Sequence, residues 1–455
     1  MAAFSRFPNA LFLQFRMRHG DIFSKVGHVT DEARQVGAAR QDPGLKKAGG
    51  NQNASHNLPI PAEKGSRIVF YLSLTAFVLF LPIGLHLPYF PVWLAARGFS
   101  PDEIATALAL PTFLRVIAAP LVTAVADKRG IAETLAACAA AAFAGYCFLA
   151  SVRAFLPVFA GALFVMIALG VMVPLADALT LAGIRRAEVM GLGRFGYARI
   201  RVWTSIGVLG TMLASGWIAS FCPGEKIILA LAALTALPAL VTIFAAAKLK
   251  HLHMPARGVH KGGLTQEPGQ LPIAFAFIGA AALIQASHAE YYSFATLHWK
   301  AISLTPGFIG VAWAIGVGSE TLLFLLAARY FTAEKNAVSF LIVGALGANV
   351  RWLAMSADPS VPAIFFLQAM HGLSFGATYF GSVLLLGGIA RETHRARMQG
   401  WLAAASALSL ALATFASGWL TSQFGQKAYI AMAALAAAGL MLALVAGTMR
   451  RRIET

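Results

Sequence analysis

The stretch ASGWIASF (214–221) returns almost unchanged as ASGWLTSQF (416–424), 202 residues further along a chain of 455 residues. Two weaker matches have offsets of 202 and 205 residues: HLPYF (86–90) with HAEYY (288–292), and FSPDEIATAL (99–108) with LTPGFIGVAW (304–313). Each match is short, but together they keep one order and nearly one spacing. A repeat of this kind predicts two structural units that are built alike and joined in tandem.

The composition is that of a membrane protein. Hydrophobic residues make up 58% of the chain and charged residues only 12%, whereas about a quarter of the residues in a soluble domain are charged. The apolar residues come in blocks of about 20–27, which as helices can cross a hydrocarbon core of roughly 30 Å. We therefore predict an all-α membrane protein with twelve transmembrane helices, at residues 67–94, 103–126, 131–152, 156–183, 197–220, 226–247, 271–298, 305–329, 336–356, 361–389, 397–423 and 426–447.

The repeat divides these spans into two pseudo-symmetric halves of six helices. Its three matches fall on the first and seventh, the second and eighth, and the fifth and eleventh spans. Six-helix halves repeated in one orientation are the architecture of a large class of transporters, whose site lies at the midplane between the halves. The expected domains are an N-terminal extension (1–66), a first half (67–247), a linker (248–270), a second half (271–447) and a basic tail (448–455).

The polar segments outside the halves carry no recognisable site. Residues 1–66 lack the apolar core and cleavage site of a signal peptide, and we expect them to be disordered in the cytoplasm. A start site assigned too far upstream explains them equally well. The linker is basic and rich in Gly and Pro. Its three histidines have no carboxylate or cysteine at ligand spacing, so we expect a solvated loop and no metal site.

Cationic residues alternate between the loops. With the N-terminus inside, the cytoplasmic segments and helix ends hold 29 of the 36 Lys and Arg residues, and the outer side holds five. This asymmetry places both termini in the cytoplasm, and we expect a multi-pass protein of the bacterial inner membrane. The net charge of +17 thus comes mostly from the cations that orient the chain in the membrane, so no nucleic-acid partner is expected. The two remaining cations, Arg115 and Arg351, lie well inside spans.

An ionisable side chain inside a membrane span is costly unless it is paired or faces water, so each one is a functional candidate. Arg115 lies near the centre of the second span, and the 205-residue offset places Glu320 at the equivalent position of the eighth. The halves thus offer a cation and a carboxyl at related positions. Alternatively, each pairs with a local partner and only fixes its helix. Burial favours the neutral form of a lone carboxyl, which suits proton loading and release.

Arg351 lies on the ninth span, roughly 7–9 Å from its outer end at about 1.5 Å per residue. At that depth its side chain can snorkel to the surface, or it can pair with Glu320, Glu290 or His371. His371 lies well inside the tenth span. It is either a hydrogen-bonded core residue or part of a site, and the sequence leaves both interpretations open.

Polar and aromatic residues share one face of two spans. On the tenth span five of them recur at helical spacing: Gln368, His371, Phe375, Thr378 and Ser382. On the seventh span the corresponding face holds Gln285, His288 and Tyr292, with Glu290 and Tyr291 nearby. His86 and Tyr89 on the first span are the repeat equivalents of His288 and Tyr291. Such mixed faces fit the wall of a substrate cavity. The residues expected to bind substrate are Arg115, Tyr89, His288, Tyr292, Gln368 and Phe375.

Asp177, in VPLADAL, lies about 9 Å from the cytoplasmic end of the fourth span by the helical rise. It can pair with Arg199 or Arg201, which open the fifth span in YARIRVW, and we expect a structural or gating pair. Asp127, in VADKRG (125–130), is expected to cap or bridge the end of the second span. The sequence contains no nucleotide-binding loop, nucleophile elbow or zinc motif, so it favours no enzymatic chemistry.

The chain resembles transporters of the major facilitator superfamily. VADKRG is similar to the loop signature after the second helix of that superfamily, although Thr123 replaces its first glycine. From about residue 70 to about 445 the chain more specifically resembles the bacterial phenylpropionate permeases, which are related to the proton-coupled lactose permeases. That resemblance rests on GLHLPYFPVWL, VPLADAL, YARIRVWTS, IQASHAEYYSF, GVGSETLLF, NVRWLAM and LQAMHGLSFG.

The resemblance implies the major facilitator fold and proton symport by alternating access. In the sugar permeases, the proton-coupling cluster has a carboxylate on the eighth helix, an arginine on the ninth and a histidine on the tenth. Those places are matched here by Glu320, Arg351 and His371. A second glutamate of those permeases is replaced by Ser374, so coupling would rest on Glu320, alone or with Glu290. Their sugar clamp is matched more loosely by Asp177 and Arg201.

These inferences predict a proton-driven secondary importer of a small organic solute, with no enzymatic activity. An aromatic or other monocarboxylic acid is the first candidate, because Arg115 and Arg351 supply cations for a carboxylate. We expect the substrate, protons and the lipid bilayer as partners, no cofactor beyond the proton gradient, and a functional monomer. The alternatives are a sugar or nucleoside proton symporter, a drug efflux pump and, more remotely, a membrane sensor that has lost transport.

Overall fold

The structure, a computed structural model, describes residues 62–190, 196–249, 270–330, 336–389 and 395–454. Within these ranges every regular element is helical. The helices are α3 (Ala62–Ala96), α4 (Pro101–Arg129), α5 (Ile131–Ser151), α6 (Phe155–Val189), α7 (Tyr197–Phe221), α8 (Ile227–Leu249), α9 (Gln270–Ala286), α10 (Ala289–Ala301), α11 (Pro306–Tyr330), α12 (Ala337–Met355), α13 (Val361–Ala369), α14 (Thr378–Ile389), α15 (Arg395–Phe424) and α16 (Tyr429–Glu454). Short helical turns occupy Gly224–Lys226, Gly372–Ala377 and Gly425–Ala428.

Each predicted span coincides with one observed helix or with a helix broken into parts. By length and apolar composition, the described part of the chain contains 11 candidate membrane spans, of which the last, Arg397–Arg451, is 55 residues long. That last candidate contains two helices, α15 and α16, separated by the turn Gly425–Ala428. Dividing it gives twelve membrane crossings, in agreement with the all-α, twelve-helix prediction.

Local sequence signals set the ends of α4. The Ser100 hydroxyl accepts a hydrogen bond from the backbone N–H of Glu103, whose carboxylate accepts one from the backbone N–H of Ser100 at 2.8 Å. This reciprocal pair is a capping box, and Pro101 follows it at a position where the helix needs no N–H donor. At the other end Gly130 has a φ of 108°, a conformation that strains any residue with a Cβ atom.

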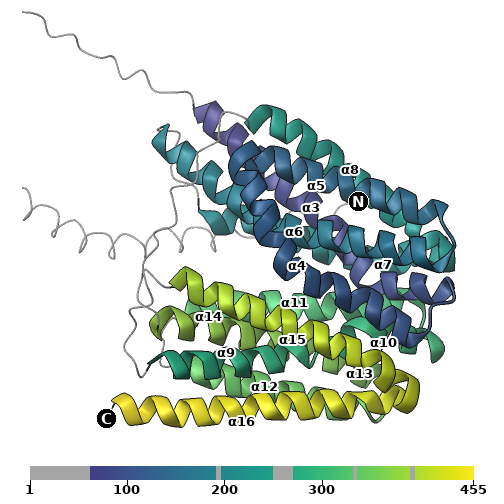
Figure 1. Cartoon of the computed structure of the whole chain (residues 1–455), viewed down its shortest axis with the longest axis vertical. Coiled ribbons are helices and arrows are strands. Elements are labelled where there is room, and N and C mark those ends of the chain that lie inside the picture. The colour runs from purple at the N-terminus through teal and green to yellow at the C-terminus, as the bar shows by residue number, and fades with distance from the viewer. Residues whose placement is uncertain (1–61, 191–195, 250–269, 331–335, 390–394, 455) are drawn as a thin grey trace, which may run out of the picture. The chain divides into compact units, whose positions relative to one another are not determined.

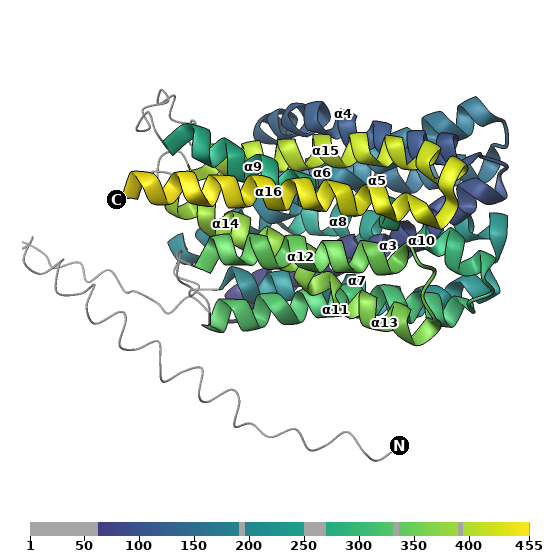
Figure 2. The same ribbon diagram turned by 90° about the horizontal axis from the view of Figure 1, so that it is seen from below.

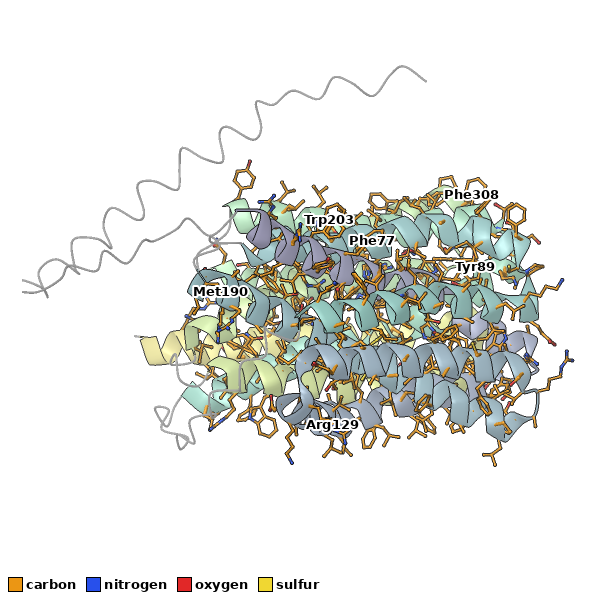
Figure 3. All side chains as sticks on the ribbon, turned by 90° about the horizontal axis from the view of Figure 1, so that it is seen from above. Phe77, Tyr89, Arg129, Met190, Trp203 and Phe308 are labelled. Atoms are coloured by element: carbon orange, nitrogen blue, oxygen red, sulfur yellow. The ribbon has the colours of Figure 1, made fainter. Side chains whose placement is uncertain are left out.

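The first six helices (α3–α8) form one group and the later helices (α9–α16) form another (Figure 1). The groups meet along two helix pairs, α4 with α15 and α7 with α11, and α10 also contacts α3 and α4. Figure 2 shows α4 beside α15 from a second direction. We name the end where α4 and α11 begin the Pro101/Pro306 end, and the opposite end the linker end. Tyr89 and Phe308 lie toward the first and Met190 toward the second (Figure 3).

The two ASGW stretches make matching contacts between the halves at the Pro101/Pro306 end. A Cβ atom on Gly216 of α7 would collide with the backbone oxygen of Pro306 in α11. A Cβ atom on Gly418 of α15 would lie 2.9 Å from the backbone oxygen of Pro101 and 2.7 Å from the Cβ of Ala105, both in α4. Only glycine lets the backbones approach this closely. The repeat found in the sequence thus corresponds to two equivalent contacts that close this end.

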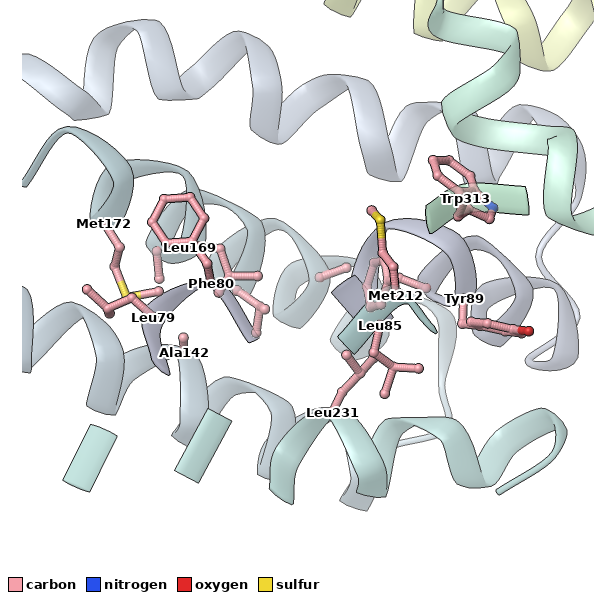
Figure 4. Packing of buried hydrophobic residues seen from close by; sticks show 14 of the residues in the cluster. Leu79, Phe80, Leu85, Tyr89, Ala142, Leu169, Met172, Met212, Leu231 and Trp313 are labelled. Atoms are coloured by element: carbon pink, nitrogen blue, oxygen red, sulfur yellow. The ribbon is translucent and has the colours of Figure 1, made fainter. Parts of the chain in front are cut away.

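Apolar side chains from both groups of helices form one core cluster. Figure 4 shows Phe80 of α3 lying close to Leu169 of α6 in this cluster. Tyr89 of α3 and Trp313 of α11 belong to the same cluster, although they come from different halves. Because lipid tails are as apolar as these side chains, close packing rather than exclusion of water stabilises such helix contacts.

The seventh span crosses as predicted, but it is not one unbroken helix. It ends as α9 at Ala286 and restarts as α10 at Ala289. In the break, Nδ1 of His288 lies 3.2 Å from the carbonyl oxygens of Ile284 and Gln285. A side chain that bonds to the carbonyls of the preceding turn competes with continuation of the helix.

The tenth span is also interrupted. Between α13 and α14 it widens into a π-helical turn at Gly372–Ala377. A π turn adds one residue to the helical repeat, so the positions that follow are rotated relative to a regular helix. The single face predicted from Gln368 to Ser382 is therefore divided at this turn.

Several predicted segments lie outside the described residues. These are the N-terminal extension up to residue 61 and residues 250–269 of the linker, which include its three histidines. The described chain begins in α3 at Ala62, slightly before the predicted start of the first span at residue 67. At the other end α16 continues to Glu454, so the predicted basic tail is helical up to that residue.

Candidate functional site

Arg351 lies on α12 and is fully buried, with 0% of its surface exposed. Its guanidinium donates hydrogen bonds to Nδ1 of His371 at 2.9 Å, to Oε1 of Gln368 at 2.9 Å and to Oγ of Ser374 at 3.3 Å. All three partners belong to the tenth span, so Arg351 joins α12 to that span. These bonds replace part of the hydration that a buried charge loses.

Two aromatic rings cover the same guanidinium. Its central carbon lies 4.5 Å from the ring centre of Tyr291 on α10 and 4.6 Å from that of Trp352 on α12. At these distances the contacts are cation–π interactions, which strengthen when water is excluded. None of the ion pairs between described residues includes Arg351. Its charge is therefore held by neutral groups and ring faces.

His371 connects Arg351 to Glu320. Because Arg351 donates to Nδ1 of His371, that nitrogen carries no proton, and the neutral ring has its proton on Nε2. Nε2 lies 3.8 Å from Oε2 of Glu320, a residue of α11 whose side chain is 22% exposed. We call Arg351, His371 and Glu320 the coupling chain, after the role expected for them from the sequence. The chain runs from a fully buried cation to a carboxyl that solvent reaches.

Both helix breaks face this chain of groups. His288, in the break before α10, has its Nε2 atom 3.1 Å from Oγ of Ser374 in the π turn. Since Nδ1 of His288 faces backbone carbonyls and donates to them, Nε2 accepts a hydrogen bond from the hydroxyl of Ser374. The rings of His288 and His371 are 5.4 Å apart between centres. π turns are frequent at functional sites, and this one brings Ser374 against both His288 and Arg351.

The structure distinguishes between the partners expected for Arg351. Arg351 bonds directly to His371, reaches Glu320 only through that ring, and does not snorkel to the surface. Glu290 lies apart and accepts a hydrogen bond from Thr421 of α15 at 2.7 Å. Direct pairing of Arg351 with a carboxylate is therefore not observed among the described residues.

Four of the residues predicted to bind substrate gather around His371. The Phe375 ring stacks on that of His371, with centres 5.4 Å apart and 11° between the planes, and Tyr292 stacks on His288 at 5.9 Å. Phe375 and Tyr292 are only partly buried, whereas Gln368 and His288 are fully enclosed. The two rings can meet a ligand at the edge of the cluster. Gln368 and His288 instead support Arg351 and Ser374 from within.

Arg115 of α4 is half-buried and lies over Gly170 of α6. Its Nη1 atom is 3.1 Å from the position that a Cβ atom on Gly170 would occupy, and its Cδ atom is closer still. Arg115 makes no hydrogen bond or ion pair with another residue that the structure describes. Glu320, at the equivalent position of the second half, faces His371 instead. The cation and carboxyl at related positions thus do not pair with each other.

Tyr89 lies in the contact between the halves rather than beside Arg351. It is almost fully buried, and its hydroxyl donates a hydrogen bond to the backbone oxygen of Pro306 at 3.2 Å. Tyr89 is therefore not among the predicted substrate-binding residues that the structure brings together around His371. Tyr89 was selected for its aromatic ring, but its position is set by the contact between the halves at the Pro101/Pro306 end.

The predicted acid–arginine pair of the first half forms with Arg201. Nε of Arg201 lies 3.5 Å from Oδ1 of Asp177, and the Tyr197 hydroxyl donates to the same oxygen at 2.8 Å. The Arg201 guanidinium also lies 5.1 Å from the centre of the Phe80 ring. Arg199 is exposed and forms no ion pair within the described ranges. These contacts join α6 to α7 and suit a structural or gating role.

Asp127 does not make the expected cap. Its side chain is exposed and bonds to no other residue in the described part of the chain. The end of α4 is instead formed by the backbone N–H of Gly130, which bonds to the carbonyl of Ala126 at 2.9 Å. Glycine can adopt the backbone conformation needed at this turn, so no side-chain cap is required.

Three contributors to the site were missed from the sequence. Trp352 directly follows Arg351, and an aromatic residue beside a buried arginine was a signal for a cation–π contact. Ser374 appeared only as a missing glutamate, although it bonds to both Arg351 and His288. Gly170 carried no signal, because its role depends on the approach of α4 to α6.

Comparison with known proteins identifies relatives of the chain. A family model described as "MFS_1 like family" matches residues 69–432. A probable 3-phenylpropionic acid transporter of Escherichia coli (strain K12) is 25% identical over 388 residues, which cover 82% of this chain and 96% of the relative. Maltose permease of Geobacillus stearothermophilus is 29% identical over 314 residues, covering 66% and 74%. The crystal structure of the nucleoside transporter NupG has a TM-score of 0.68 at 17% identity, covering 84% and 98%.

Proposed function

Because the chain belongs to the MFS_1 like family and has the twelve-helix fold of major facilitator transporters, we propose that it is a proton-coupled symporter that imports a small monocarboxylic acid, preferably an aromatic one. Family and fold establish a membrane transport protein with a small-molecule substrate, and they point away from an enzyme. The driving ion, the substrate class and the direction of transport are the content of the proposal.

The coupling chain is the observation that carries this proposal. When Glu320 holds a proton it is neutral and needs no partner. When it releases the proton, the carboxylate can accept a hydrogen bond from Nε2 of His371, which Arg351 polarises through Nδ1. Loss of the proton thereby strengthens the contact between α11 and the tenth span. A proton and a substrate that favour the same arrangement of these helices promote each other's binding and are coupled through them.

Arg115 is the proposed partner of the substrate carboxylate. Arg351 is already hydrogen-bonded and covered by two rings, whereas Arg115 is half-buried and has no acid partner among the described residues. Tyr292 and Phe375 offer partly exposed ring faces on which an aromatic substrate could stack. The relative described as a probable 3-phenylpropionic acid transporter combines a carboxylate with a ring in its substrate, and it supports this choice.

We further propose that the linker end faces the cytoplasm of a bacterial cell. Cationic residues concentrate at that end, as they do on the cytoplasmic side of membrane proteins. The tight contacts at the Pro101/Pro306 end then close the outer side, and the structure corresponds to an inward-facing arrangement. Because both halves of the site come from one chain, a monomer suffices for the cycle.

Uptake by purified protein in liposomes tests the coupling. With acid outside, the wild-type protein should concentrate 3-phenylpropionate above equilibrium. Glu320→Gln keeps the shape of the side chain but cannot release a proton. It should lose uphill accumulation while still exchanging internal for external substrate. Glu188→Gln, at an exposed position near the end of α6, is the matched control and should transport like the wild type. Full accumulation by Glu320→Gln would refute coupling through Glu320.

Proton-coupled sugar import is the second candidate. It is favoured by the similarity to maltose permease and by the pairing of Asp177 with Arg201. A thermal-shift screen of carboxylates and sugars on the purified protein separates the two functions. For Arg115→Ala, our proposal requires loss of stabilisation by carboxylates alone, with Arg153→Ala at the protein surface as control. Stabilisation by sugars and not by acids in the wild type would favour the second candidate.

A further inference from the structure

Glu290 is a second carboxyl within the membrane-spanning helices, apart from the coupling chain. It lies at the start of α10 and is only 2% exposed. Its Oε1 atom accepts the hydrogen bond from Thr421, whereas Oε2 is buried without a partner in the described part of the structure. No Lys, Arg or His in those ranges lies within ion-pair distance. Glu290 therefore differs from Glu320, which has His371 beside it.

The helices packed around α10 bring no opposite charge to Glu290. Among the described residues, α15 contributes Ser417 and Thr421, α16 contributes Tyr429, and α3, α4 and α11 contribute no charged group that acts on Glu290. The hydroxyl of Tyr429 is itself buried and unpaired in this part of the chain.

These surroundings favour the protonated form of Glu290. A carboxylate removed from water needs a cation or several hydrogen-bond donors to be stable. Here the Thr421 hydroxyl donates to Oε1, and Oε2 has no hydrogen-bond partner in the described part of the structure. In the arrangement observed, the carboxyl of Glu290 therefore has the contacts that suit a neutral acid. Its ionised form requires water, which the packing of α10 against α15 excludes.

One turn of α15, from Gly418 to Thr421, connects Glu290 to the Pro101/Pro306 end. Thr421, which bonds to Glu290, lies one helical turn after Gly418, which packs against Pro101 of α4. The other neighbours of α10 include α3 and α4 from the first half. Separation of the halves at the Pro101/Pro306 end would move this turn and let water reach Glu290.

We propose that Glu290 is a second proton-binding site, whose protonation locks the Pro101/Pro306 end in its closed state and whose deprotonation accompanies the opening of that end. The site goes beyond the proposed coupling chain, because it acts on the conformation without substrate. It therefore holds or fails independently of Glu320.

A distance measurement across the Pro101/Pro306 end tests this site. Cys138, Cys147 and Cys222 are replaced by serine, and spin labels are attached to Ser151→Cys and Ser360→Cys, exposed positions at this end in the two halves. The distances between the two spin labels are then recorded in liposomes without substrate, from about pH 5 to about pH 9, a range in which a buried carboxyl can titrate. The ratio of the closed population to the open population of the wild type should fall by at least about tenfold over this range, as for one titrating group.

The variants decide between Glu290 and other titrating groups. Glu290→Gln, which stays neutral, should remain closed at every pH, whereas Glu320→Gln should respond like the wild type. A wild type without a pH response, or an unchanged response in Glu290→Gln, would overturn the proposal. So would a response that disappears in Glu320→Gln alone.

A milder variant serves in case Glu290→Gln does not fold. Thr421→Val removes a donor that stabilises the carboxylate more than the neutral acid. The midpoint of opening should therefore move to higher pH, by about one unit for the loss of one such bond. Thr414→Val, on the same helix, should leave the midpoint unchanged. No shift, or a shift to lower pH, in Thr421→Val would contradict the assignment.

Discussion

The two halves of the molecule share a scaffold but not its chemistry. His86 in the first half and His288 in the second occupy equivalent positions of the repeat. His86 lies within the unbroken helix α3, bonds to the Tyr146 hydroxyl at 2.6 Å and stacks on Phe90. His288 lies in a helix break and contacts Ser374 beside the coupling chain. A duplicated helix pattern has thus become a packed support in one half and a polar site in the other.

The contacts between the halves, in contrast, remain symmetric. Gly216 and Gly418 are equivalent in the repeat, and each lets its helix approach the first turn of a helix from the other half. The symmetry of the repeat is kept in these contacts and is lost around Arg351. Closure of this end thus uses equivalent glycines of both halves, whereas the polar cluster around Arg351 belongs to the second half alone.

The largest expected effect is that of removing the buried cation of the second half. Arg351→Met leaves His371, Gln368 and Ser374 without their donor and should lower the stability of the protein, by about 1–3 kcal/mol for each buried acceptor left unpaired. Arg115→Met, in the first half, breaks no hydrogen bond between described residues and should leave the melting temperature nearly unchanged. Thermal unfolding in detergent measures both. Equal losses of stability would contradict the asymmetry between the halves.

Breaking the symmetric contacts should have an intermediate effect. Gly216→Ala and Gly418→Ala each place a methyl group against backbone or side-chain atoms of the other half, at about 1–3 kcal/mol against the closed state. The effect should be larger for Gly216, where the approach is closer. The spin-label distances across the Pro101/Pro306 end measure the shift. Gly210→Ala, on α7 but with no neighbour within 4 Å, is the matched control.

The smallest effect is expected where the first half meets the substrate. Gly170→Ala should displace Arg115 without removing it. We expect a three- to tenfold higher KM for carboxylate uptake, or about 1 kcal/mol of binding, with kcat unchanged. Gly387→Ala, at an open position of α14, is the control. An unchanged KM would show that the packing of Arg115 over Gly170 does not matter for substrate binding.

The positions of the helices could be predicted from the sequence, because they depend on local properties. The length of an apolar block and the alternation of Lys and Arg reflect membrane thickness and sidedness alone. The repeat that contains Gly216 and Gly418 was also visible, although the contacts of these two glycines were not predicted from it. These features require no knowledge of which helices become neighbours.

The arrangement of the site could not be predicted, because it depends on contacts between distant spans. The break at His288 is stabilised by Trp352, whose indole N–H donates to Ser287 at 2.8 Å across 65 residues of sequence. Three candidate partners of Arg351 could be named, but the choice among them depends on how the π turn rotates the tenth span. The polar and ionisable side chains of the site can be found in the sequence, whereas only the fold determines which of them are in contact.

The break at Ser287–His288 also has a mechanical consequence. The first piece of the seventh span, α9, packs mainly against α15, α16 and α14 of its own half, whereas the second piece, α10, also touches α3 and α4 across the interface. An unbroken helix would have to tilt as one piece, whereas a break at this point allows α10 to tilt while α9 stays packed in its own half. A change around His288 is therefore expected to reach the contacts of α10 with the first half more than those of α9.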